Sequence, residues 1–151
     1  MSPDRPGTPA TGPETQLVPD PGVSSHAARG PVIVVDVDRA DCSRASRLLG
    51  DAGFDVISAM DGRSALRQVF ATSGQPSLLL CAIELPGMSG IELAARVTAA
   101  RPGVRVILMS ADAAAVERAS QHAQLVQAVL LKPYTTEGFR AAVTAALAPD
   151  A

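Results

Sequence analysis

From Pro31 onward the chain alternates short apolar runs with longer segments of mixed polarity. The apolar runs occupy residues 32–35, 55–59, 78–82, 104–110 and 126–131. Each is only a few residues long, and Gly, Pro or polar residues close it, which is typical of a buried strand in a parallel sheet rather than of a helix. The run at 55–59 is half polar and predicts a strand at the edge of the sheet.

The segments between these runs have the spacing of amphipathic helices. Asp41 is placed to cap a helix that extends to about Asp51. After Asp61 and Gly62, a second helix is expected to carry Ala65, Leu66, Val69 and Phe70 on one apolar face. Further helices are predicted around residues 91–101, 111–123 and 137–147. Regular strand–helix alternation predicts an α/β fold, with a doubly wound parallel sheet between two layers of helices.

Composition limits the number of domains. The chain has 151 residues, 47% of them hydrophobic, which suffices for the core of one ordinary domain. Residues 1–30 contain six prolines among Gly, Ser and Thr, so we expect a disordered N-terminal tail there and the folded domain at residues 31–149.

Charge and cysteine content exclude several classes of function. The formal net charge is −2 and no basic cluster occurs, so binding to nucleic acid or to an acidic membrane is not expected. No apolar stretch is long enough to cross a bilayer, and no signal peptide begins the chain, which favours a cytoplasmic protein. Cys42 and Cys81 have no metal-ligand spacing and are interpreted as buried structural thiols.

Polar residues follow several of the predicted strands. Asp36 and Asp38 follow the first strand, Ala82 and Glu84 the third, Ser110 the fourth and Lys132 the fifth. Ligands of open parallel sheets bind at these carboxyl ends, so we expect a site there. Lys132 is the only lysine in the chain, since every other basic side chain except histidine is arginine. The sequence thus favours a compact ammonium group at this one position.

Four segments together resemble the receiver domain of bacterial two-component response regulators. They are VIVVDVD from Val32, LLLCAIELPGMSG from Leu78, VILMSA from Val106, and LLKP ending at Pro133. The resemblance covers about residues 32–147 and implies a CheY-like, flavodoxin-like sheet of order 2-1-3-4-5 with a cis bond before Pro133. It also implies phosphoryl transfer from a histidine kinase to an aspartate at the end of the third strand. In that family an acidic pair on the first strand holds Mg²⁺, and a Ser or Thr and a Lys hold the phosphoryl oxygens.

Position by position, this sequence departs from that pattern. Asp36, Ser110 and Lys132 match, but Val37 stands where the second metal-binding acid is expected and Ala82 occupies the phosphoacceptor position. Val129 replaces the aromatic residue of the fifth strand. An acyl phosphate requires a carboxylate nucleophile and a metal, so we expect no catalytic residue, no enzymatic activity, and weak or absent Mg²⁺ binding. Three departures in one mechanism favour a natural, degenerate pseudo-receiver over a single introduced change.

Lys132 must have an anionic partner, because a buried unpaired ammonium costs several kcal/mol. Asp36, Asp38 and Glu84 are the candidates. We favour Asp36, with Ser110 as a further contact.

Three classes of function remain. The favoured one is a stand-alone pseudo-receiver that acts in signal transduction by phosphorylation-independent binding to a protein partner or to a second copy of itself. The resemblance to the receiver family implies an interface formed by the fourth helix, the fifth strand and the last helix, around Val129 and Tyr134. The alternative is a phosphotransfer receiver with an unconventional acceptor (Asp38, Asp36 or Glu84), and a binder of small molecules in the vacated pocket also stays open.

Overall fold

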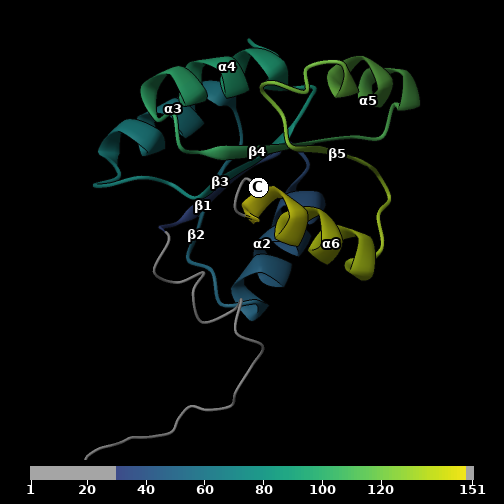
Figure 1. Ribbon diagram of the computed structural model, residues 1–151, viewed down its shortest axis with the longest axis horizontal. Coiled ribbons are helices and arrows are strands. Elements are labelled where there is room, and N and C mark those ends of the chain that lie inside the picture. Colours follow the sequence, from purple (N-terminus) through teal and green to yellow (C-terminus); the bar gives the residue numbers. More distant parts are fainter. Residues whose placement is uncertain (1–29, 149–151) are drawn as a thin grey trace, which may run out of the picture.

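A computed structural model describes residues 30–148 of the chain. Its strands are β1 (Val32–Val35), β2 (Val56–Ala59), β3 (Leu78–Ala82), β4 (Arg105–Ser110) and β5 (Ala128–Leu131). Its helices are α2 (Arg39–Asp51), α3 (Gly62–Ala71), α4 (Gly90–Ala100), α5 (Ala113–Ser120) and α6 (Thr136–Leu147), labelled in Figure 1. The predicted N-terminal tail lies outside the described residues, apart from Gly30. Within residues 30–148 no helix is long and apolar enough to span a membrane.

The five strands form one parallel sheet in the order β2-β1-β3-β4-β5. This confirms the predicted flavodoxin-like, doubly wound fold, and it places the half-polar strand β2 at an edge. The central strands β1 and β3 are buried along their whole length. A strand that is covered on both faces cannot alternate between apolar and polar residues, which explains the uninterrupted apolar runs in the sequence.

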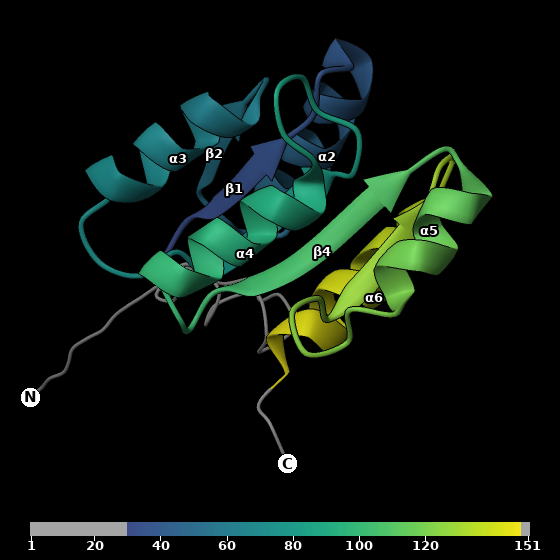
Figure 2. The same ribbon diagram turned by 90° about the horizontal axis from the view of Figure 1, so that it is seen from above.

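The helices cover the sheet in two layers. Helices α3, α4 and α5 lie on one face and α2 and α6 on the other (Figure 1), and Figure 2 shows the three-helix layer from above. Ile33 and Val35 of β1 belong to the core under α3, α4 and α5, whereas Val32 and Val34 face α2 and α6. The period of two along the strand thus divides the apolar side chains between two cores.

The roles predicted for two helix residues, Asp41 and Phe70, were wrong. Asp38, not Asp41, caps α2: the Asp38 side chain accepts a hydrogen bond from the Asp41 backbone N–H at 3.0 Å. Phe70 does not share the buried face of α3, because the residue is 63% exposed. The centre of its ring lies 5.9 Å from the Arg101 guanidinium carbon. At helical spacing Phe70 follows Val69 by 100°, which is enough to turn it out of the core.

The fourth predicted helix is shorter than expected. It spans Ala113–Ser120 instead of residues 111–123, because Asp112 acts as its N-cap and accepts a hydrogen bond from the Ala114 N–H at 3.0 Å. This cap fixes where α5 starts relative to the end of β4.

Gly90 is required where α4 passes the end of β3. Its N–H donates to the Ile83 carbonyl at 2.7 Å. A Cβ added at Gly90 would run into the Ala82 carbonyl oxygen and lie 3.0 Å from the Ile83 Cα, and neither backbone atom can move freely. The close contact holds the β3–α4 loop against the end of its strand.

Replacing Gly90 by Ala should therefore lower the free energy of unfolding by about 1–3 kcal/mol, through a steric clash with backbone. The matched control is Gly50→Ala in α2, where an added Cβ meets nothing within 4 Å. That change should stabilise the protein by up to about 1 kcal/mol because alanine has the higher helix propensity. Urea denaturation of both variants tests the pair, and equal stabilities would contradict the proposed contact.

Candidate functional site

The predicted site residues meet at the carboxyl ends of the strands. Asp36 follows β1 and its N–H donates to the Ala59 carbonyl at 3.1 Å, while the Lys132 N–H donates to the Ser110 carbonyl at 2.8 Å. Asp36 and Ser110 are each only 1% exposed. Polar groups buried to this extent must find partners within the protein.

Lys132 finds two carboxylates. Its Nζ lies 2.7 Å from Asp36 Oδ2 and 2.9 Å from Asp41 Oδ2. The other Asp36 oxygen, Oδ1, accepts the Asp38 N–H at 3.0 Å. The ammonium thereby joins the end of β5 to the end of β1 and to the first turn of α2.

The other predicted partners of Lys132 bind elsewhere. Asp38 caps α2, and the carboxylate of Glu84 contacts Ser110. The sequence does not predict the contact between Lys132 and Asp41, because the helical pattern assigns Asp41 as the cap of the helix. The signal was present in the sequence: with Asp38 as the cap, Asp41 is the third residue of the helix, where an acidic side chain favours the helix N-terminus.

Ser110 belongs to a second, separate group of contacts rather than to the ion pair. Its Oγ lies 3.0 Å from Glu84 Oε1 and 2.9 Å from Oε2, and it accepts the Asp112 N–H at 2.9 Å. Since a carboxylate only accepts, the serine hydroxyl donates to Glu84. Ser110 therefore connects the β3–α4 loop to the cap of α5.

The ionisation of several groups responds to this environment. Burial alone would lower the pKa of the Lys132 ammonium, but the hydrogen bonds and charges of Asp36 and Asp41 outweigh it, so the pKa is raised. Burial, and secondarily the charge of Asp36, raise the pKa of both thiols, Cys42 and Cys81. Each thiol is thus kept in its unreactive protonated form, consistent with the structural role expected of both.

Tyr134 is fixed between helices on the same side of the sheet. The Arg44 guanidinium lies 4.7 Å from the centre of the Tyr134 ring and donates to the Tyr134 carbonyl at 3.1 Å, and the ring centres of Tyr134 and Phe139 are 5.2 Å apart. The bond between Lys132 and Pro133 is cis. Two residues after Lys132, Tyr134 therefore connects α2 to α6. Val129 is a half-buried contact of the opposite core.

The residues present do not fit the magnesium site that the resemblance implies. Val37 carries no oxygen ligand and is 52% exposed, and the methyl group of Ala82 is 4% exposed. Asp36 is left as the one carboxylate of the expected set, and Lys132 already holds it. Magnesium prefers several hard oxygen ligands, and this position offers one carboxylate that is already paired.

Asp36 should contribute more to stability than Asp41. Its side chain is 2% exposed, against 41% for Asp41. We expect Asp36→Asn to lower the free energy of unfolding by about 1–3 kcal/mol at neutral pH. The matched control Asp41→Asn should cost less than about 1 kcal/mol, because a partly exposed pair is screened by solvent. Chemical denaturation measures both, and an Asp36→Asn variant as stable as the parent would contradict the role of the pair.

The contribution of Lys132 should depend on pH. A group whose pKa is raised by folding stabilises the fold fully below its unfolded pKa, about 10 for lysine, and loses that contribution as pH rises through the raised value. The Lys132→Met variant should thus be less stable than the parent by about 3 kcal/mol at pH 7, since it leaves Asp36 buried beside fewer partners. The difference in free energy of unfolding between the parent and the variant, measured by chemical denaturation, should become smaller at alkaline pH. Tyr134 and the thiols are present in both proteins, so a difference that does not change with pH would rule out the ion pair as its cause.

Comparisons with known proteins agree with this geometry. The family profile of the response regulator receiver domain matches residues 32–144. The transcriptional regulatory protein PrrA of Mycobacterium tuberculosis is 30% identical over 128 residues, which cover 85% of this chain and 52% of that protein. A protein-glutamate methylesterase/protein-glutamine glutaminase of Caulobacter vibrioides is 40% identical over 80 residues, covering 52% of this chain and 22% of that protein. The chain thus spans about half the length, or less, of these curated relatives.

Solved structures show the same fold. A receiver domain protein from Methanospirillum hungatei aligns with a TM-score of 0.69 at 23% identity, over 78% of this chain and 93% of that one. A receiver domain protein from Clostridium thermocellum aligns with a TM-score of 0.68 at 19% identity, over 78% of this chain and 94% of that one. The sheet order, the convergent strand ends and the sequence match lead to one conclusion: this chain belongs to the response regulator receiver family of two-component signal transduction.

Proposed function

We propose that this protein is a pseudo-receiver, which acts in signal transduction by binding a protein partner without being phosphorylated. The observation that carries the proposal is Ala82. At the end of the central strand β3, where the family places its phosphoacceptor aspartate, the side chain is a buried methyl group. A methyl group provides no nucleophile for phosphoryl transfer.

The alternative acceptors are all engaged. Asp36 is paired with Lys132, Glu84 accepts the Ser110 hydroxyl, and Asp38 caps α2. A phosphoryl group on any of these side chains would add charge and bulk beside the contact that the side chain already makes. The geometry thus favours a binding module over phosphotransfer to an unconventional residue.

Magnesium binding should be weak or absent, because few carboxylate oxygens are available to hold the ion. Phosphoryl transfer relies on a metal to offset the charge of the phosphoryl oxygens. Val37 removes an expected ligand, and Lys132 holds the remaining acid of the pair. The protein would thus lack both the acceptor and the metal of the family's reaction.

The face formed by α5, β5 and α6 supports a protein as partner. Strand β5 lies at the edge of the sheet and pairs with β4. Its last residue, Leu131, is 47% exposed, next to Lys132. The unpaired edge of β5 offers backbone groups to another protein surface, either a different partner or a second copy of this chain.

Incubation with a small phosphodonor and Mg²⁺ tests the proposal. We expect no gain of one phosphate in the intact mass, because no carboxylate is available as a nucleophile at the end of β3. The amide spectrum should show no magnesium-dependent shift around Asp36. A gain of one phosphate by the unaltered protein would overturn the pseudo-receiver assignment.

A double variant provides the positive control. Val37→Asp together with Ala82→Asp restores both carboxylates that the family pattern requires, on the same fold. If this variant gains a phosphate under identical conditions while the parent does not, the missing groups account for the difference. Ser110 and Lys132 are left unchanged in both proteins.

A further inference from the structure

The Ser110 hydroxyl uses both of its hydrogen-bonding roles. It accepts the Asp112 N–H at 2.9 Å, so its proton points away from that amide, toward the carboxylate of Glu84 at 2.9 and 3.0 Å. Ser110 is only 1% exposed. A rotation of this side chain would break at least one of these contacts, so the hydroxyl is held in one orientation.

We propose that Glu84 is a built-in anion that holds Ser110 and thereby fixes the start of α5 in one state, with no added group. The proposal rests on the pseudo-receiver function and concerns how that site is regulated. In it, Glu84 is a positioning residue that acts on α5 through Ser110.

The position of Ala82 explains why the anion comes from the loop. Ala82 has no oxygen on its side chain, so β3 itself offers no side-chain acceptor to the Ser110 proton. The backbone of the next residue, Ile83, makes two hydrogen bonds. Its N–H donates to the Met109 carbonyl at 2.8 Å, and its carbonyl accepts the Gly90 N–H at 2.7 Å. Glu84 follows directly, so its backbone starts from a fixed point next to the end of β4.

Other carboxylates at this edge of the sheet are committed. Asp36 and Asp41 both contact the Lys132 ammonium. The two sets of contacts share no side chain, although the Lys132 N–H donates to the Ser110 carbonyl at 2.8 Å. Glu84 therefore acts on Ser110 independently of the ion pair.

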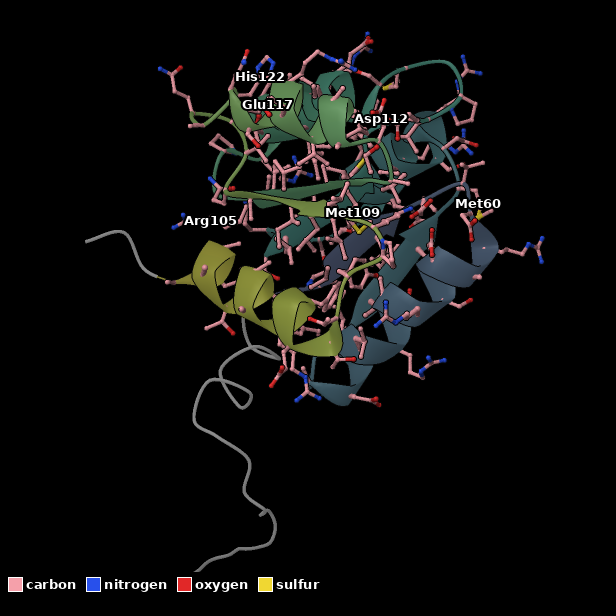
Figure 3. All side chains as sticks on the ribbon, turned by 90° about the vertical axis from the view of Figure 1, so that its right-hand side faces the viewer. Met60, Arg105, Met109, Asp112, Glu117 and His122 are labelled. Atoms are coloured by element: carbon pink, nitrogen blue, oxygen red, sulfur yellow. The ribbon has the colours of Figure 1, made fainter. Side chains whose placement is uncertain are left out.

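The contacts continue from Ser110 into α5. The Asp112 N–H binds the Ser110 hydroxyl, the Asp112 side chain accepts the Ala114 N–H at 3.0 Å, and the Asp112 carbonyl accepts the Val116 N–H at 3.0 Å. Figure 3 shows Asp112 at the start of α5, with Glu117 and His122 farther along the same layer. Because α5 forms part of the face proposed to bind a partner, Glu84 would set the position of that face.

Amide hydrogen exchange on the protein alone tests the proposal. Loss of a charge-assisted hydrogen bond in Glu84→Ala should free the Ser110 hydroxyl and accelerate exchange of the Asp112 amide by about tenfold. Glu92→Ala is the matched control, because Glu92 is an exposed glutamate whose partner is Arg96, so exchange at Asp112 should be unchanged. Equal rates at Asp112 in Glu84→Ala and the parent would overturn the proposal.

A further variant separates the charge of Glu84 from its shape. Glu84→Gln keeps an acceptor oxygen but removes the charge, and we expect an exchange rate between those of the parent and Glu84→Ala, or equal to the latter. A Gln variant that exchanges at the rate of the parent would show that no anion is needed.

The Ser110→Ala variant tests whether Glu84 acts through Ser110. It should accelerate exchange of the Asp112 amide as well, and adding Glu84→Ala to it should cause no further acceleration. Additive effects would mean that Glu84 does not act through Ser110.

These measurements involve neither a phosphodonor nor a partner, so they fail independently of the proposed function. A phosphate gain by the parent would overturn the pseudo-receiver assignment and leave the exchange result standing. Unchanged exchange in Glu84→Ala would overturn the positioning role and leave the assignment standing.

Discussion

Lys132 is the only lysine in the sequence, and the arrangement of the site depends on the contacts of its ammonium group with two carboxylates. Asp36 reaches it from the end of β1 and Asp41 from the first turn of α2, at 2.7 and 2.9 Å. A buried charge with good geometry costs little, whereas the same charge without its partner costs several kcal/mol. The strand ends and α2 are therefore held together by a requirement for charge balance, which is met although the last residue of β3 is Ala82.

The polar groups at this edge form two sets of contacts instead of one network. The ion pair connects β1, β5 and α2, while Ser110 connects the β3–α4 loop to α5 through Glu84 and Asp112. Ala82 lies on the strand between them and contributes only a methyl group. Each set holds its own side chains in place, which gives this edge of the sheet a defined shape.

The sequence allowed the fold to be predicted because strands buried on both faces leave uninterrupted apolar runs, and the alternation with helices determines a parallel sheet. Side-chain pairing was predicted less completely. Whether Asp38 or Asp41 caps α2 depends on a shift of three residues that both patterns permit, and the second partner of Lys132 depends on that choice. The Glu84 contact depends on the path of the β3–α4 loop, which the backbone contacts of Ile83 and Gly90 determine and which local pattern does not reveal.

The charges at this edge of the sheet support the proposed phosphorylation-independent role. Asp36, Asp41 and Glu84 bring three carboxylates to it, and Lys132 brings one ammonium. A phosphoryl group would add a charge of about −2. A metal ion can offset such repulsion, but the side chain of Val37 carries no oxygen and Asp36 is already paired with Lys132. The Glu84 carboxylate already lies against Ser110, so an incoming phosphoryl oxygen would have to displace a like charge before it could reach the hydroxyl.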